Sequence, residues 1–299
     1  MRKIDYFDLG GTLYVPIINE NISAILRREK YPFLKSVVIC LEDSILDSDL
    51  SRGMNILENI FQTYEVTDLK VFVRARNIDN LNDILTLENI HLLDGFVLPK
   101  FDLSNASEYL SIFLTENHFY IMPILETSSV FNPMHLHQIS ETLEPFKERI
   151  LSIRIGAEDI LSKLEIMRNC QKTLYEIMPL YITISTIINT FKPKGFNISS
   201  TVFPCFESAE YLKKELQSDI EHQLINKTSI HPSQIETIHN SYKVTHDEYI
   251  IATKLLDEEV AIFNYHNKMY EKVTHLNWAR TILKRYKSFG MIERVCNAQ

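Results

Sequence analysis

The sequence predicts an α/β protein, a (β/α)8 barrel with a C-terminal helical extension. Short apolar runs recur along most of the chain, and stretches with helical periodicity lie between them. Strands that alternate with helices of this length indicate parallel βα units. Nearly every apolar run also ends in an ionisable residue, and polar groups at the carboxyl ends of eight strands are typical of a barrel with its active site at that face.

The predicted strands are eight apolar runs, at residues 12–16, 37–41, 71–73, 96–99, 120–125, 151–153, 201–204 and 228–230. From the second run onward, each leads to ionisable residues, in order Glu42 and Asp43, Arg74, Lys100, Glu126, Arg154, Glu207 and His231, with Asp159 soon after Arg154. A charge beside a packed core is costly unless it is paired, bound to metal or available to substrate. Each of these residues alone could simply cap the next helix, but ionisable groups at seven strand ends on one rim indicate an active site.

Helices are expected after the first five strands, over residues 19–28, 51–61, 81–90, 104–114 and 134–149. Ser104 and Ser208 are predicted N-caps. The sixth connection, 160–197, is long enough for two helices. Its most apolar part, 174–191, contains Glu176 and Pro179 and is interpreted as a buried helix rather than a membrane span. The last barrel helix is expected over 232–241.

We predict that residues 1–243 form the barrel and that residues 244–299 form a helical arm, with helices over 247–258 and 275–289. Such an arm packs either on its own barrel or on a neighbouring subunit, and the sequence leaves both arrangements open.

Composition excludes several classes of function. The chain has 299 residues, a net charge of −8 and no basic stripe interleaved with aromatic residues, which argues against nucleic acid as a partner. Its seven glycines form no phosphate-binding loop. Acidic residues follow the first methionine too soon for a signal peptide, and no membrane association is expected. Four scattered cysteines without a C-x-x-C pattern indicate a reducing, cytoplasmic location and argue against a disulfide framework or a structural zinc; they are Cys40, Cys170, Cys205 and Cys296.

Several rim residues have two interpretations. Arg74 and Arg76 share a face by strand alternation, so one binds substrate, with Arg74 favoured, and the other pairs with Glu42 or Asp43. Lys100 is either a nucleophilic lysine or, more in keeping with the nearby acids, part of an ion pair. His231 is either a general acid or base or a cap of the last barrel helix. With Arg154, these residues are the candidates for substrate binding.

The sequence also resembles a known family. The matching segments are Leu13-Tyr14-Val15-Pro16, Leu41-Glu42-Asp43-Ser44-Ile45, Val73-Arg74-Ala75-Arg76-Asn77, Asp94-Gly95-Phe96-Val97-Leu98-Pro99-Lys100, Ile124-Leu125-Glu126-Thr127, Ile155-Gly156-Ala157-Glu158-Asp159-Ile160 and Ile230-His231-Pro232-Ser233-Gln234-Ile235. In order and spacing they resemble the citrate lyase beta subunit family, within the HpcH/HpaI aldolase superfamily.

One branch is especially similar, the carbon–carbon lyase-like proteins of tellurite-resistance-type stress operons. The residues that carry this resemblance are Arg74-Ala75-Arg76-Asn77, Gly195-Phe196-Asn197, Lys268-Met269-Tyr270-Glu271 and Trp278-Ala279-Arg280.

The resemblance implies roles for individual residues. Glu126 and Asp159 match the carboxylates that hold Mg²⁺, which prefers hard oxygen ligands; Glu158 is a neighbouring alternative, but the Gly156-x-x-Asp spacing favours Asp159. Arg74 matches the arginine that grips a substrate carboxylate or carbonyl. Glu42 and Asp43 match the acidic pair that orders the active-site network. The resemblance also favours a homo-oligomer, a trimer.

Two departures from the family pattern affect the predicted substrate. Cys40 stands where the family usually has aspartate, and a turn that usually ends in Gly-Lys reads Asn226-Lys227. That turn lies near where the family receives coenzyme A, so a coenzyme A thioester is doubtful. The predicted function is a Mg²⁺-dependent carbon–carbon lyase or aldolase acting on a β-hydroxy acid or its thioester, with a small carboxylate substrate. The alternative is a non-catalytic barrel that serves as a binding or assembly component of a stress operon.

Overall fold

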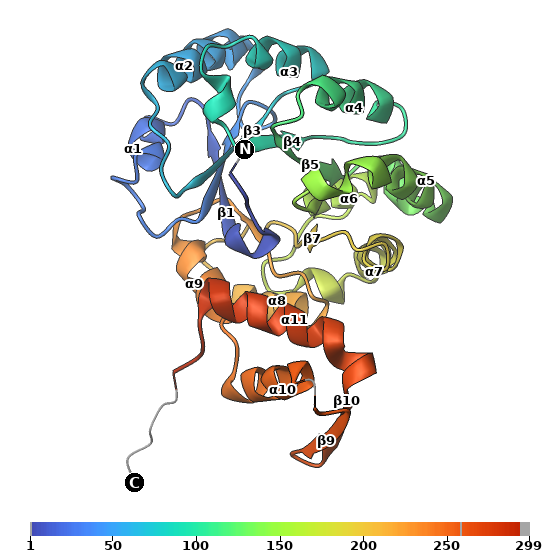
Figure 1. The fold of residues 1–299 in the computed structure, drawn as a ribbon. Coiled ribbons are helices and arrows are strands. Elements are labelled where there is room, and N and C mark those ends of the chain that lie inside the picture. The colour runs from blue at the N-terminus through green and yellow to red at the C-terminus, as the bar shows by residue number, and fades with distance from the viewer. Residues whose placement is uncertain (1, 258, 294–299) are drawn as a thin grey trace. The chain divides into compact units, whose positions relative to one another are not determined.

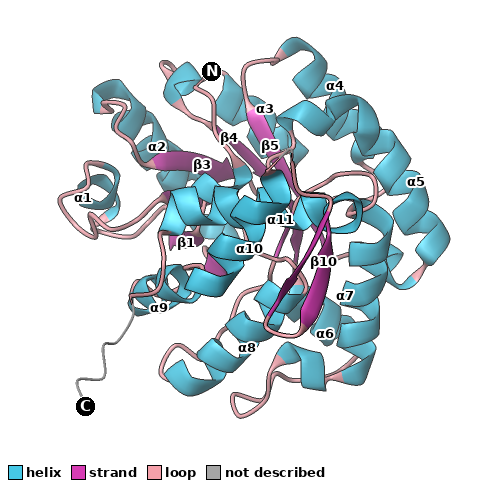
Figure 2. Cartoon of the chain, turned by 60° about the horizontal axis from the view of Figure 1, so that its bottom comes forward, coloured by secondary structure: helices cyan, strands magenta, loops and turns pink. Residues whose placement is uncertain are grey.

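The computed structural model describes residues 2–257 and 259–293. The chain divides into two compact units, one ending at Ile235 and the other beginning at Glu236. In the first unit, strands lie at the centre and helices surround them (Figures 1 and 2). The predicted (β/α)8 barrel is confirmed.

The barrel sheet has the strand order β7-β6-β5-β4-β3-β2-β1-β8 within the described residues, and every neighbouring pair is parallel. Its strands are β1 Gly11–Pro16, β2 Ser36–Cys40, β3 Lys70–Arg74, β4 Gly95–Leu98, β5 Tyr120–Leu125, β6 Ile153–Ile155, β7 Ile198–Ser199 and β8 Lys227–Ser229. A parallel bridge between Ser200 and Lys227 joins the end of β7 to β8. This bridge closes the ring, and because all neighbouring strands are parallel, their carboxyl ends lie on one face.

Helices follow the strands in order. They are α1 Ile22–Leu26, α2 Leu50–Thr63, α3 Ile78–Leu85, α4 Ala106–Thr115, α5 Pro133–Leu143, α6 Ala157–Lys163, α7 Met178–Phe191, α8 Ala209–Glu221 and α9 Ser233–Ser241. The sixth connection holds two helices, α6 and α7, as predicted. A large apolar core fills the space between strands and helices, and a smaller one, including Val38, Phe72 and Met122, fills the barrel interior.

Some boundaries differ from the prediction. The seventh strand ends before the expected run 201–204, because its pairing with β6 involves only Ile198 and Ser199. Asn105, not Ser104, occupies the N-cap position of α4, whereas Ser208 does occupy that position in α8. The expected helix 134–149 is α5 followed by a 3-10 helix that begins at Glu144, where Pro145 interrupts the α-helical hydrogen bonding.

The second unit contains α10 His246–Leu256, β9 Ile262–Tyr265, β10 Lys268–Glu271 and α11 Lys272–Phe289. Helices α10 and α11 share an apolar core that includes Ile251, Leu255 and Ile282. The antiparallel hairpin of β9 and β10 was not predicted. His266 and Asn267 form its two-residue turn, and both adopt positive φ, as a tight hairpin turn requires. Residue 258 and residues 294–299 of the predicted arm, including Cys296, lie outside the described residues.

The cysteine prediction is wrong in one respect. Cys170 and Cys205 form a disulfide with a Cα–Cα distance of 5.6 Å, and Cys40 is free and buried. The two bonded residues are 35 positions apart, but Cys170 lies in the loop after α6 and Cys205 in the loop after β7, and the strands β6 and β7 are neighbours. Spacing along the chain therefore gave no sign of the pair. In the described part of the chain, no helix combines the length and apolar character required to cross a membrane.

Candidate active site

A cavity of about 380 Å³ opens among the carboxyl ends of the barrel strands. Its lining residues come from or directly follow β1, β2, β3, β5, β6, β7 and β8; they are Tyr14, Pro16, Cys40, Asp43, Ser44, Arg74, Ile124, Glu126, Arg154, Ile155, Gly156, Ala157, Glu158, Asp159, Val202, Thr228 and Ile230. The predicted residues Asp43, Arg74, Glu126, Arg154 and Asp159 are thus brought together around one cavity.

Glu126 is held in place by its neighbours. Its Oε1 accepts a hydrogen bond of 2.8 Å from the backbone N–H of Lys100, a residue whose φ of +49° is in the left-handed region. A Cβ built on Gly156 would lie 2.1 Å from the Glu126 Oε2, so only glycine leaves room for this carboxylate. Glu126 is 3% exposed, and burial together with the negative charge of Asp159 raises its pKa to about 7.

The pair Glu126 and Asp159 fits Mg²⁺ in donor chemistry. Two carboxylates face the cavity, and among the described residues Oε2 of Glu126 accepts no hydrogen bond. Their mutual repulsion, which raises the pKa of Glu126, would be relieved by a cation. The described residues hold no group of three or more metal-binding side chains, and Mg²⁺ commonly takes only one or two protein carboxylates. Glu158 also lines the cavity, but Asp159 is the residue whose charge acts on Glu126.

Arg74 ends β3 and reaches into the cavity. Its Nη1 lies 3.0 Å from Oε2 of Glu42, and its Nε and Nη2 lie 3.2 and 3.1 Å from Sγ of Cys40. Its guanidinium carbon is 5.4 Å from the ring centroid of Tyr14. The arginine is therefore oriented by β1 and β2, as a positioned anion-binding group requires.

Lys100 forms an ion pair. Its Nζ pairs with Glu42 and, at 3.3 Å, with Asp43. Burial lowers the pKa of Lys100, but the charges of Glu42 and Asp43 outweigh this effect, so the pKa lies above its ordinary value. A nucleophilic lysine needs a lowered pKa, so the ion-pair interpretation agrees with the structure.

Arg154 lies at the cavity floor and is 2% exposed. Its Nη1 and Nη2 donate to the Oγ1 atoms of Thr228 and Thr12, both at 3.1 Å, and its Nε is 3.4 Å from the Sδ of Met122. Its guanidinium carbon is 5.5 Å from the Tyr14 ring centroid. All four of these contacts are to uncharged groups.

Three predicted substrate-binding residues, Lys100, Arg76 and His231, do not line the cavity. The expectation that Arg76 shares a face with Arg74 is wrong, because β3 ends at Arg74. The carboxylate partner of Arg76 is Asp47, at 2.5 Å from its Nη1, and not the predicted Glu42 or Asp43. Arg76 also donates to the backbone oxygen of Ile45 at 2.8 Å. The Nδ1 of His231 lies 2.7 Å from the Oγ of Ser233, the first residue of α9, which agrees with the capping interpretation.

The family model described as "C-C_Bond_Lyase of the TIM-Barrel fold" matches residues 3–291. The chain belongs to this carbon–carbon bond lyase family. No curated protein matches it.

The barrel of this family member is also similar to solved structures. A citrate lyase from Burkholderia xenovorans LB400 is 15% identical, with a TM-score of 0.74, over 96% of this chain and 94% of the other. CitE from Mycobacterium tuberculosis, in complex with magnesium, acetoacetate and coenzyme A, is 18% identical, with a TM-score of 0.67, over 93% and 98% of the two chains. RipC from Yersinia pestis is 17% identical, with a TM-score of 0.62, over 82% and 99%. At these identities the likeness concerns the fold.

Sequence reasoning gave no role to several cavity residues of this lyase-family barrel, including Tyr14, Cys40 and Thr228. The signal for Tyr14 was present, because Thr12, Tyr14 and Pro16 alternate along one strand and so share a face. By contrast, Asn226 is fully buried immediately before β8, at the amino end of the strand and opposite the cavity. The doubt about a coenzyme A thioester stays a prediction.

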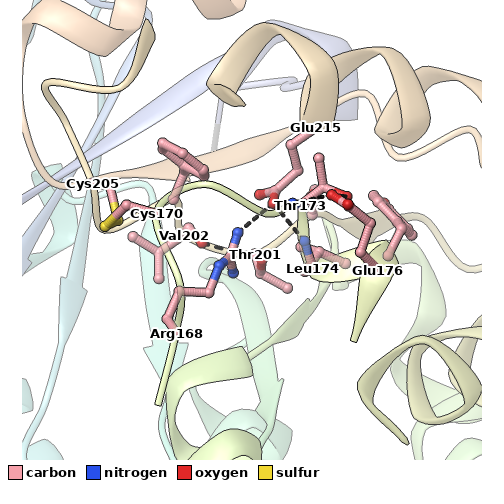
Figure 3. A network of polar contacts seen from close by, with 12 residues as sticks. Arg168, Cys170, Thr173, Leu174, Glu176, Thr201, Val202, Cys205 and Glu215 are labelled. Atoms are coloured by element: carbon pink, nitrogen blue, oxygen red, sulfur yellow. Dashed lines mark hydrogen bonds and ion pairs between the residues drawn. A yellow bond between two sulfur atoms is a disulfide. The ribbon is translucent and has the colours of Figure 1, made fainter. Parts of the chain in front are cut away.

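A second group of buried charges joins β8, α8 and the loop after α6, and Figure 3 shows the part of it around Arg168 and Glu215. We call Arg168, Glu215, Asp219 and Lys227 the outer charge network. Nζ of Lys227 lies 2.9 Å from carboxylate oxygens of both Glu215 and Asp219, and Arg168 pairs with Glu215. Glu215 also accepts the backbone N–H of Leu174 at 2.9 Å. The network and the nearby disulfide together tie the loop after α6 to α8 and to the loop after β7.

Proposed function

We propose that this protein is a Mg²⁺-dependent lyase or aldolase that breaks a carbon–carbon bond in a β-hydroxy acid or its thioester. One observation carries the proposal: two carboxylates that repel each other, Glu126 and Asp159, share a cavity with the positioned guanidinium of Arg74. The family adds support, since its members are grouped as carbon–carbon bond lyases. CitE from Mycobacterium tuberculosis, of similar fold, is described as a complex with magnesium and pyruvate as well as with acetoacetate.

The proposed cleavage is a retro-aldol step. The substrate hydroxyl loses its proton, its carbon becomes a carbonyl, and the electron pair of the broken bond passes to the carbon beside the carboxylate, which then takes a proton. Arg74 binds and orients that carboxylate through its planar guanidinium. Glu42 fixes Arg74 and Lys100 by ion pairs and so keeps the rim ordered. Bound at Glu126 and Asp159, Mg²⁺ would polarise the adjacent oxygen and offset the developing negative charge.

The first test concerns the metal. Isothermal titration calorimetry should show Mg²⁺ binding to the unaltered protein and a clear loss of affinity in Glu126→Ala. Glu108→Ala is the matched control, because Glu108 is an exposed glutamate on α4 that does not line the cavity. Equal Mg²⁺ affinity in all three proteins would remove the metal assignment.

The second test concerns turnover. The protein and Mg²⁺ are incubated with a panel of hydroxy acids, free and as coenzyme A thioesters, while release of pyruvate, glyoxylate or oxaloacetate is followed. Arg74→Ala should lower kcat/KM by the equivalent of about 2–5 kcal/mol, the scale for truncating one partner of a buried charge pair. Turnover that survives both Arg74→Ala and Glu126→Ala would contradict the mechanism.

The same panel separates this function from the non-catalytic alternative. If no free acid and no thioester is cleaved, a binding or assembly role in a stress operon is favoured. Under either function we propose a cytoplasmic homo-oligomer, and light scattering would show whether it is a trimer.

A further inference from the structure

Arg154 differs from the other arginines with nearly fully buried side chains in the described part of the chain. Arg168 pairs with Glu215, and Arg285 pairs with Glu248 at 2.7 Å. Arg154 has no carboxylate within 4 Å among the described residues and is held instead by two threonine hydroxyls, a thioether and an aromatic ring. It is the exception to the rule that a buried charge is accompanied by its counter-charge.

This arrangement is energetically unfavourable in the empty cavity. A buried ion loses its hydration, and neutral hydroxyls replace only part of it. A guanidinium has five N–H donors, and three of its nitrogens use one each on Thr228, Thr12 and Met122. The remaining donor capacity and the full positive charge lie at the floor of a cavity that admits a ligand. An anion entering this cavity would supply the missing counter-charge.

The position of Arg154 relative to Arg74 restricts the size of that anion. Both guanidinium carbons lie within 5.5 Å of the ring centroid of Tyr14. A ligand that reaches both therefore needs a chain of only a few carbon atoms, and a cavity of about 380 Å³ accommodates one. Arg74 already has Glu42 beside it, whereas Arg154 has no such partner.

We propose that Arg154 binds a second carboxylate of the substrate, which makes the substrate a short dicarboxylic hydroxy acid. One carboxylate lies on Arg74, beside the bond that breaks, and the other lies on Arg154 at the cavity floor. The inference rests on the proposed function and adds to it the class of substrate.

The test compares ligands that differ by one carboxylate. With saturating Mg²⁺, calorimetry should show that succinate binds the unaltered protein about tenfold or more tightly than butyrate, which has the same number of carbons; tenfold corresponds to about 1.4 kcal/mol. Arg154→Met should remove this preference while retaining Mg²⁺ affinity, and Arg154→Lys should retain part of it. Arg52→Met, which removes an exposed arginine on α2, should leave the preference unchanged.

The preference of the unaltered protein requires no variant, so the test holds even if Arg154→Met does not fold. Succinate binding no better than butyrate would overturn the inference, as would a preference that survives Arg154→Met. If the protein cleaves monocarboxylic hydroxy acids and does not bind succinate more tightly than butyrate, the inference about Arg154 is wrong and the proposed lyase function is retained. If succinate is preferred through Arg154 but no acid is cleaved, the carboxylate-binding site is retained and the proposed lyase function is wrong.

Discussion

The first unit buries two groups of charges, and they are completed in different ways. In the outer charge network, Arg168 and Lys227 face Glu215 and Asp219, so two positive and two negative groups are paired by protein alone. At the cavity, Glu126 and Asp159 repel each other, and Arg154 has no carboxylate nearby among the described residues. The network is suited to holding the chain together, and the cavity is suited to receiving a cation and an anion from outside.

Burial of charge by itself therefore does not indicate function. Lys227 is fully buried, and burial lowers its pKa, but Asp219 and Glu215 raise it by more, so the ammonium form is retained. The protein itself therefore supplies the counter-charges of Lys227. Buried charges that lack a counter-charge within the protein are the stronger indication of a functional site. The following experiments test this distinction, in order of expected effect.

The largest effect is expected for Glu215→Ala. This variant leaves Arg168 buried without its counter-charge and deprives Lys227 of one of its two, so we expect a loss of about 3–5 kcal/mol in the free energy of unfolding. Urea denaturation measures it. Glu210→Ala, which breaks an exposed pair with Lys214 on the same helix, should change stability far less. Similar losses in both variants would mean that the network is not a special stabilising feature.

The second effect is a pH dependence in the absence of Mg²⁺. The pKa of Glu126 is about 7 in the folded protein, above its ordinary value of 4.5, so the folded state holds a proton that the unfolded state releases. Its contribution to stability is present below pH 4.5 and is lost as pH rises through 7, by roughly 3 kcal/mol. Denaturation in a chelator from pH 4 to 8 should show a steeper fall for the unaltered protein than for Glu126→Gln. Parallel curves would show that Glu126 has an ordinary pKa.

The disulfide is expected to contribute less. Cys170 and Cys205 close a loop with a sequence separation of 35, and their replacement by serine should lower the free energy of unfolding by about 2–3 kcal/mol. The neighbouring pair of Arg168 and Glu215 still holds the loop, so the fold should persist. Adding a reductant to the unaltered protein is the matched comparison. A midpoint of unfolding that neither treatment changes would show that the bond does not stabilise the chain.

The smallest change in stability is expected for Arg154→Met. Because Arg154 leaves no carboxylate unpaired when it is removed, the free energy of unfolding should change by about 1 kcal/mol or less, in either direction. Thermal unfolding at matched pH would measure this beside Glu215→Ala. A loss as large as that of Glu215→Ala would place Arg154 among the structural charges and erase the difference between the two regions.

Much of the fold was predictable because it depends on local pattern. Apolar runs that alternate with helical periods determine parallel βα units, and a polar residue after each run determines what lies at the carboxyl face. Arg74, Glu126, Arg154 and Asp159 were identified in this way, and all four line the cavity. Single strand ends were less predictable: Arg76 points away from the cavity because β3 stops two residues earlier.

The barrel and its charged rim could be predicted from the sequence, since periodicity and strand-end chemistry are properties of neighbouring residues. Which charges have partners became clear only from the folded structure. Glu215 and Asp219 are spaced like solvated charges on a helix, and Cys170 is 35 residues from Cys205, yet packing of α8 on β8 and of β6 beside β7 buries or joins them. The physical reason is that pairing depends on distance in space, which segments far apart along the chain acquire only when the barrel closes.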